Sequence, residues 1–254
     1  MNKTLLGLSV VIAIAGCGTG GDYHAGKDGH HATHWSYEGE GGPENWGSLS
    51  DEYKTCGTGQ SQSPININGE KDMGLKPIEF HYAKSTNSEV INNGHTIQVN
   101  YAPGSYAVIS GKKYDFLQFH FHSPSEHQVH GEHADLVVHL VHKSPDDGQL
   151  AVVAVLFDKD GESEFLKPIW RAMPRAKGDS TVAGTIDVNT VLPTDKDYFN
   201  YSGSLTMPPC SEGVNWNVLA THVSVSDAQV AAFTSMFANN IRPIQPLNDR
   251  VIGM

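Results

Sequence analysis

The sequence predicts a mainly β fold, a single domain built on a large central sheet with a few peripheral helices. Short segments rich in β-branched and aromatic residues recur along most of the chain. Gly, Pro, Asn and Asp separate these segments, and such residues mark turns. Only two stretches have the residue pattern of a helix. Strands therefore outnumber helices by a wide margin.

Eight strands are expected, at residues 78–82, 89–91, 96–101, 106–109, 115–122, 136–142, 150–157 and 214–223. The run 150–157 is apolar throughout, which is typical of a strand covered on both faces. Helices are expected at 163–173 and 226–237, the second opening with Ser226 and Gln229 at the spacing of an N-terminal cap. The helices therefore lie outside a sheet that forms the centre of the domain.

Residues 34–254 are expected to form one domain, because no linker or internal repeat interrupts them. The chain has 254 residues and a formal net charge of −11. A surface with this charge repels phosphate backbones, so nucleic acid is excluded as a partner.

The N-terminal residues have the pattern of an export signal. Residues 1–16 contain one lysine and an apolar run, and the sequence Ile14-Ala15-Gly16-Cys17 resembles a bacterial lipobox. A lipid on Cys17 would anchor the protein to a membrane at the periplasmic or extracellular face, with the Gly- and His-rich residues 17–33 as a flexible linker. A simple cleaved signal peptide or a short membrane helix is the alternative, although the apolar run is short for a membrane span.

Three histidines have a spacing that suits one metal ion. His120 and His122 project from the same face of a strand, because side chains alternate along it. His139 lies on the next expected strand, within reach of the same ion if the two strands pair in antiparallel fashion. Three protein ligands with a fourth position open to water are typical of a catalytic zinc site. Taken singly, a histidine on a half-buried strand is more often a hydrogen-bonded core residue than a metal ligand.

The surroundings of these histidines resemble the α-class carbonic anhydrases of bacterial type over most of the chain. The resemblance rests on ordered blocks: His34-Trp-Ser-Tyr37, Gly42-Pro-Glu-Asn-Trp46, Gln60-Ser-Gln-Ser-Pro-Ile65, Asn92-Asn-Gly-His95, Gln118-Phe-His-Phe-His122, Ser125-Glu-His127, His139-Leu-Val-His142, Tyr201-Ser-Gly-Ser-Leu-Thr-Met-Pro-Pro209 and Asn240-Ile-Arg-Pro243. It implies a twisted, mostly antiparallel sheet of about ten strands. It also implies a zinc-dependent lyase that reversibly hydrates carbon dioxide to bicarbonate and a proton by means of zinc-bound hydroxide.

The resemblance assigns expected roles to further residues. Glu126 and Thr206 would direct the proton of the hydroxide, and His95 would carry protons to solvent. The remaining positions fall into three groups. They are a carbon dioxide wall of Val141, Val152, Leu205, Val214 and Trp216; a polar lining of Tyr37, Asn93 and Gln98; and Gln118 with the Asn240 carbonyl as hydrogen-bond partners of His120 and His122.

Cys56 and Cys210 remain if Cys17 is lipidated, and an oxidising compartment allows two thiols to pair. Two separate buried thiols are the alternative. The resemblance implies a disulfide at these positions, which would tie the segment carrying Thr206 to the N-terminal part of the domain.

Two positions depart from the family pattern. Val137 stands where the family usually has a glutamate that orients the third metal ligand, so His139 should be held less firmly and zinc retained less well than in a Val137→Glu variant. Met207 replaces a common threonine and should narrow the mouth of the site.

Two other functions are compatible with the sequence. One is a catalytically silent binding module on the same fold, although all three expected ligands are present. The other is a zinc-storage lipoprotein, suggested by 14 histidines. Either a monomer or a homodimer is compatible with the sequence.

Overall fold

A computed structural model describes residues 34–254. The expected signal peptide, Cys17 and the linker 17–33 lie outside the described residues. Within residues 34–254, no helix combines the length and apolar character needed to cross a membrane.

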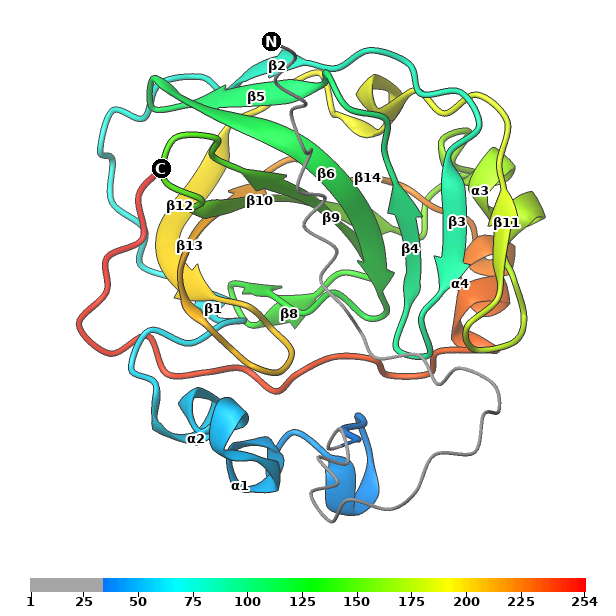
Figure 1. Cartoon of the computed structure of the whole chain (residues 1–254). Helices are drawn as coiled ribbons and strands as arrows, with labels where there is room; N and C mark the ends of the chain where they lie inside the picture. Colours follow the sequence, from blue (N-terminus) through cyan, green and yellow to red (C-terminus); the bar gives the residue numbers. More distant parts are fainter. Residues whose placement is uncertain (1–33) are drawn as a thin grey trace, which may run out of the picture. The chain divides into compact units, whose positions relative to one another are not determined.

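The main sheet has eleven strands and confirms the predicted mainly β fold. Eight strands form a continuous path: β11 (Ser180–Val182), β3 (Glu89–Asn92), β4 (Ile97–Asn100), β6 (Lys112–His122), β9 (Leu136–Lys143), β10 (Leu150–Asp158), β13 (Glu212–Leu219) and β12 (Tyr198–Ser204). Strand β14 (Val223–Ser224) pairs with β10, while β5 (Tyr106–Ile109) lies between β6 and β2 (Glu79–His81). Only the pairs β10–β13 and β10–β14 are parallel among these strands. Figure 1 shows the strong twist of the sheet between β3 and β10.

The smaller elements include several that the sequence pattern missed. A second sheet contains β1 (Asn66–Ile67), β7 (Gln128–Val129) and β8 (Glu132–His133). Four short α-helices are α1 (Trp46–Leu49), α2 (Thr55–Thr58), α3 (Leu166–Ala172) and α4 (Asp227–Thr234), and 3-10 turns occupy Gly39–Gly41, Asp51–Tyr53 and Val188–Val191.

Several expected elements differ from those observed at one or both ends; strand β6, for example, begins three residues before the expected start at 115. Helices α3 and α4 are shorter than the ranges 163–173 and 226–237, although Ser226 and Gln229 form the predicted capping box. The expected strand 214–223 is two elements, because residues between Leu219 and Val223 leave the sheet.

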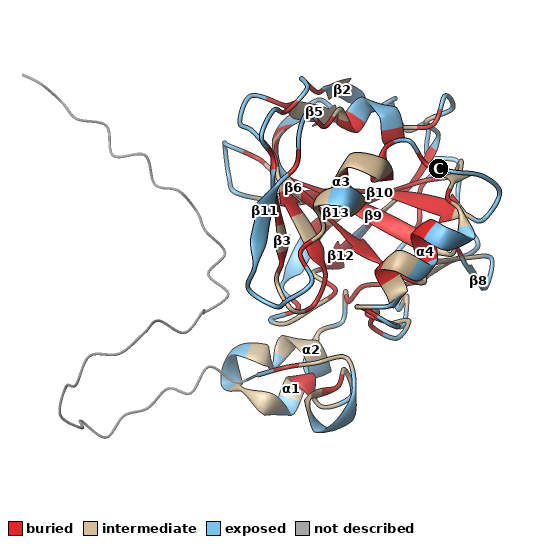
Figure 2. Ribbon diagram, turned by 90° about the vertical axis from the view of Figure 1, so that its right-hand side faces the viewer, coloured by how far each residue is buried: buried red, intermediate tan, exposed pale blue. Residues whose placement is uncertain are grey.

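The two faces of the central strands pack against different apolar clusters. Phe119, Phe121, Leu140 and Val153 point into a large core that α3 and α4 cover. Val137, Val141, Val152 and Trp216 belong to a second cluster on the opposite face. Figure 2 shows that β9 and β10 are buried along most of their length, whereas β11 is exposed. Because side chains alternate along β6 and β9, the three histidines face the second cluster.

Candidate metal centre

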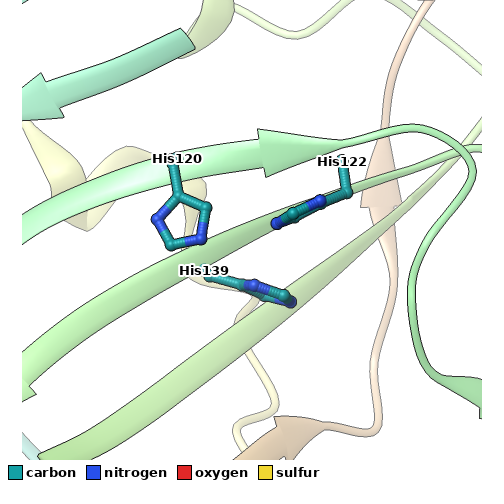
Figure 3. Close-up of side chains that lie close together, drawn as sticks. All are labelled: His120, His122 and His139. Carbon is teal, nitrogen blue, oxygen red and sulfur yellow. The ribbon is translucent and has the colours of Figure 1, made fainter. Parts of the chain in front are cut away.

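Strands β6 and β9 bring His120, His122 and His139 together. In the antiparallel pairing of these strands, His120 lies directly opposite His139, and His122 lies one side-chain repeat further along the same face. One ring nitrogen from each histidine lies within 4.8 Å of the corresponding nitrogens of the other two. Figure 3 shows the three rings gathered around one point. All three side chains are buried.

Two of the rings are oriented by hydrogen bonds on the side away from this point. His120 Nδ1 lies 3.0 Å from Gln118 Oε1, and His122 Nδ1 lies 2.6 Å from the backbone carbonyl of Asn240. A carbonyl oxygen can only accept, so Nδ1 carries the proton and Nε2 keeps its lone pair. His122 Nε2 is accordingly buried without a protein partner.

His139 presents its Nδ1 to the site, whereas His122 presents its Nε2. His139 Nδ1 lies 3.9 Å from Glu126 Oε2, and His122 Nε2 lies 3.6 Å from the same oxygen, so both nitrogens face one region. His139 Nε2 is buried and has no hydrogen-bond partner. Val137, two residues earlier on the same face, is fully buried and offers that nitrogen no polar group.

Burial determines the charge state of the ligands. Burial lowers the pKa of His120 and His139 well below the usual value, and the charges of neighbouring histidines act in the same direction. These rings are therefore neutral at pH 7 and keep a lone pair for coordination. Three imidazoles at this separation are a donor set that could hold a zinc ion and leave one position open.

Glu126 lies beside the three histidines and is completely buried. Its Oε1 accepts a hydrogen bond from the backbone N–H of Arg242 at 3.1 Å. Burial raises the pKa of the Glu126 carboxyl, while His122, a hydrogen bond with the Thr206 side chain and Arg242 lower it. The expected pair of Glu126 and Thr206 is thus in contact next to the ligands.

The five apolar residues expected to contact carbon dioxide lie in one cluster. Val141 is opposite Val152 across β9 and β10, and Val152 is opposite Trp216 across β10 and β13. Val214 belongs to the same cluster, and Leu205 packs against it. Met207 instead packs against a separate cluster that contains Trp35, Trp46 and Cys210.

His95 is mostly buried, with 8% of its surface exposed. Its ring stacks on Trp35, with centroids 3.7 Å apart and planes inclined by 10°. Burial lowers the pKa of His95 to about 4, and the charges of Lys177 and His34 contribute to this shift. Lys177 Nζ lies 3.2 Å from His34 Nε2, and both of these side chains border His95.

The residues expected to line the proton path have mixed surroundings. Tyr37 Oη is buried without a partner. Asn93 Oδ1 accepts from the backbone N–H groups of His95 and Thr96, which fixes the turn before β4. Gln98 donates to Asn100 Oδ1 at 2.8 Å.

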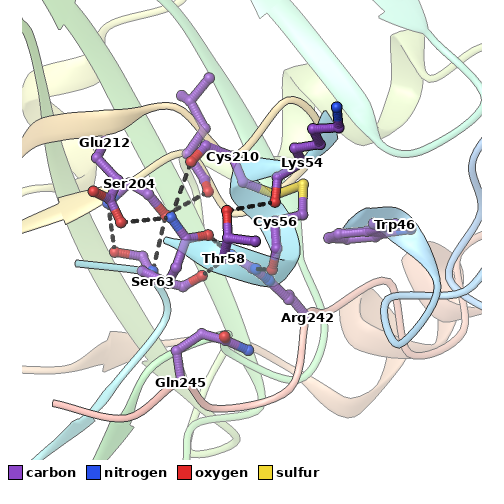
Figure 4. The surroundings of a disulfide bond; sticks show 12 residues. Trp46, Lys54, Cys56, Thr58, Ser63, Ser204, Cys210, Glu212, Arg242 and Gln245 are labelled. Carbon is purple, nitrogen blue, oxygen red and sulfur yellow. Dashed lines mark hydrogen bonds between the residues drawn. A yellow bond between two sulfur atoms is a disulfide. The ribbon is translucent and has the colours of Figure 1, made fainter. Parts of the chain in front are cut away.

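Cys56 and Cys210 form a disulfide, in agreement with the sequence-based expectation. Arg242, a residue to which the sequence patterns assigned no role, is buried next to it (Figure 4). Its guanidinium donates to Gln62 Oε1, Ser63 O and Cys56 O, each at 2.8 Å. The backbone N–H of the same arginine binds Glu126, so the disulfide region is linked directly to the site.

Fold and site together define a class of protein: a β-sheet protein with three histidines that could hold a metal ion, beside a buried carboxylate and an apolar wall. A sequence model of the family described as eukaryotic-type carbonic anhydrase matches residues 41–254. A carbonic anhydrase of Klebsiella pneumoniae is 47% identical over 225 residues, which is 87% of this chain and 91% of that protein. One of Neisseria gonorrhoeae is 41% identical over 252 residues, 98% of this chain and 97% of that protein.

A solved structure agrees with these sequence matches. The α-carbonic anhydrase of Thermovibrio ammonificans, solved with the inhibitor sulfanilamide, superposes with a TM-score of 0.85 and 42% identity, covering 88% of this chain and all of that one. The chain belongs to the α-carbonic anhydrase family, whose members are lyases that hydrate carbon dioxide.

Proposed function

We propose that the protein is a zinc-dependent carbonate dehydratase that reversibly converts carbon dioxide and water to bicarbonate and a proton. The convergence of three buried histidine nitrogens on one point, in a chain of this family, is the observation that carries this proposal. His120, His122 and His139 would hold the ion. When bound, zinc acts as a Lewis acid that makes hydroxide available from water near neutral pH, as is established for carbonic anhydrases.

The protein groups around the ion would orient the nucleophile and bind the substrate beside it. Thr206 would accept a hydrogen bond from the nucleophile and donate a hydrogen bond from its own hydroxyl to Glu126, which as a carboxylate can only accept. Val141, Val152, Leu205, Val214 and Trp216 would provide a wall without hydrogen-bond donors, suited to carbon dioxide because that molecule is small and carries no net charge. The nucleophile would then present its lone pair to the carbon atom of the substrate.

Purified protein should show both the activity and the metal content. We expect stopped-flow assays to detect carbon dioxide hydration and metal analysis to find one tightly bound zinc per chain. Several weakly bound zinc ions, lost when residues 18–34 are removed, would instead indicate zinc storage. Absence of hydration by zinc-loaded protein would contradict the proposal.

Replacing Thr206 by valine should reduce hydration about 10²-fold while zinc stays bound, because the variant keeps the side-chain shape and removes only the hydroxyl that orients the nucleophile. Hydration rate and zinc content measured on the same preparation test this. The matched control is Thr194→Val on the exposed surface, which should be fully active. Equal rates in the two variants would remove Thr206 from the relay.

We propose His95 as the group that passes the reaction's proton to solvent. In the position stacked on Trp35 its low pKa makes it a poor proton acceptor at pH 7, so proton transfer would require the ring to turn towards water. His95→Ala should therefore slow hydration about 10-fold in weak buffer, and added imidazole should restore the rate. An unchanged rate in weak buffer would refute the role.

Lys177→Ala should raise the pKa of His95 above the value of about 4. Removing a positive charge that opposes protonation makes the charged imidazole more stable. The titration of the His95 ring protons by NMR measures this change directly. Arg175→Ala removes an exposed charge, two residues from Lys177 in the sequence, that does not contribute to the shift of the His95 pKa, and it serves as the comparison. A pKa that stays the same would show that the charge of Lys177 does not contribute to the shift.

The disulfide is typical of proteins in oxidising compartments outside the cytoplasm. We propose that the protein is exported as a lipoprotein, with residues 1–16 removed and Cys17 lipidated at the periplasmic or extracellular face. Metabolic labelling with a radioactive fatty acid should mark the protein, and Cys17→Ser should abolish the label and release the protein from membranes. A labelled Cys17→Ser protein would exclude Cys17 as the attachment site.

A further inference from the structure

His139 and His127 are neighbouring histidines that each have one buried nitrogen without a partner. The unpartnered atoms are His139 Nε2 and His127 Nδ1. The ring centroids are 6.3 Å apart, with planes inclined by 77°. Both rings also contact the indole of Trp216, at centroid distances of 4.6 Å for His127 and 4.9 Å for His139. The two unpartnered nitrogens therefore belong to one packed group of aromatic rings.

The hydrogen bonds behind His127 indicate which of its nitrogens carries the proton. Ser63 Oγ accepts from the backbone N–H of Ser204 at 3.0 Å and lies 2.8 Å from Tyr201 Oη. Tyr201 Oη lies 2.6 Å from His127 Nε2. Among the described residues, both hydroxyl protons find an acceptor only if Ser63 donates to Tyr201 and Tyr201 donates to His127 Nε2. Neutral His127 then carries its proton on Nδ1.

His139 carries its proton on Nε2, the nitrogen that faces away from the other two ligands. Its Nδ1 faces Glu126 and the other two ligands, so this is the nitrogen available for the metal. A neutral imidazole that coordinates through Nδ1 keeps its proton on Nε2. Both unpartnered nitrogens are thus N–H donors, and a buried donor without an acceptor is costly. Val137, at the position expected to hold a carboxylate, is fully buried, and its side chain offers no acceptor.

We propose that one buried water molecule accepts hydrogen bonds from His127 Nδ1 and His139 Nε2, and that His127 acts through it as the positioning residue for His139. Water can receive both N–H groups because its oxygen has two lone pairs. Ordered waters commonly satisfy buried polar groups in this way. The chain Ser63, Tyr201 and His127 would then fix the orientation of a metal ligand without a carboxylate. This proposal rests on the metal site proposed above.

The proton positions can be measured in zinc-loaded wild-type protein. Long-range ¹⁵N–¹H NMR spectra of the histidine rings should show the proton of His127 on Nδ1 and that of His139 on Nε2. A crystal structure of the same form should contain an ordered water within hydrogen-bond distance of both nitrogens. A proton on Nε2 of His127, or no water between the two rings, would overturn the proposal.

The positioning role has a readout in the rate at which zinc is lost to a chelator. Tyr201→Phe keeps the ring and removes the hydroxyl that orients His127, and His127→Phe removes the donor itself. Each should accelerate zinc loss about 10-fold, whereas Val137→Glu, which supplies an acceptor directly, should slow it about 10-fold.

His142→Phe is the matched control for these variants. His142 is also fully buried, also bonds a tyrosine hydroxyl through Nε2, at 2.8 Å from Tyr82 Oη, and also has an unpartnered Nδ1. It lies on the opposite face of β9 from the ligands, so its variant should retain wild-type zinc loss. Equal rates in Tyr201→Phe, His127→Phe and His142→Phe would overturn the role of His127. A wild-type protein that binds no zinc would instead contradict the proposed function.

Discussion

The His120→Ala variant is expected to bind no zinc at neutral pH and to lose carbon dioxide hydration by on the order of 10³-fold or more, because without the ion water returns to its ordinary pKa. Two histidines would remain, and one of them, His139, has no direct protein partner for Nε2, the nitrogen that faces away from the ion. The ion would therefore lose one ligand of three and depend on another that has no direct hydrogen bond to a protein group on that nitrogen. Metal analysis and stopped-flow hydration of the same preparation give the two readouts.

Two comparisons separate this effect from a loss of folding. His81→Ala removes an exposed histidine and should match the wild type in both zinc content and rate. Thermal unfolding followed by circular dichroism should show that His120→Ala remains folded. Tight zinc binding with full activity in His120→Ala would mean that the three histidines are not the metal site.

Removal of the disulfide should have the largest effect on stability. The disulfide closes a loop of 154 residues. For a loop of this length, the chain-entropy model gives a stabilisation of about 5 kcal/mol. The double variant Cys56→Ser/Cys210→Ser should therefore lose up to about 5 kcal/mol in its free energy of unfolding, measured by urea denaturation. Unfolding of the wild type with and without a reductant provides an independent measurement.

The same variant should also show a functional effect. The backbone N–H of Cys210 donates to the carbonyl of Met207 at 2.9 Å, next to Thr206. The carbonyl of Cys56 accepts from the buried guanidinium of Arg242. Loosening either contact should displace Thr206 or Glu126, so the folded double variant should hydrate carbon dioxide more slowly. A variant with wild-type stability and rate would show that packing alone holds these segments.

Strong local patterns explain which strands could be predicted. The strands expected at 136–142 and 150–157 differ from β9 and β10 by one residue at their ends, because continuous apolar runs define them. Strand β12 was missed because Asn200, Ser202 and Gly203 interrupt its aromatic residues. Strands β1, β7 and β8 have two residues each, too few for any periodicity.

The same limit applies to the site: local sequence patterns predict contacts within one strand but not contacts between residues far apart in the sequence. Alternation along one strand was sufficient to place His120 and His122 on one face. The contacts from Lys177 to His34 and from Arg242 to Glu126 join residues far apart in sequence, and no local pattern contains them. The hydrogen-bonded chain behind His127 was missed for the same reason, although Tyr201 and His127 both lie in blocks shared with the family.

The segment after α4 has a consequence for the order of assembly. The carbonyl of Asn240 orients His122, its side chain binds Ser123, and the backbone of Arg242 binds Glu126. A polypeptide still emerging from the ribosome or a translocation pore therefore lacks these supports until Arg242 is free. Stable metal binding should accordingly follow completion of synthesis. Proteolysis just before Asn240 should abolish activity even if the sheet itself stays folded.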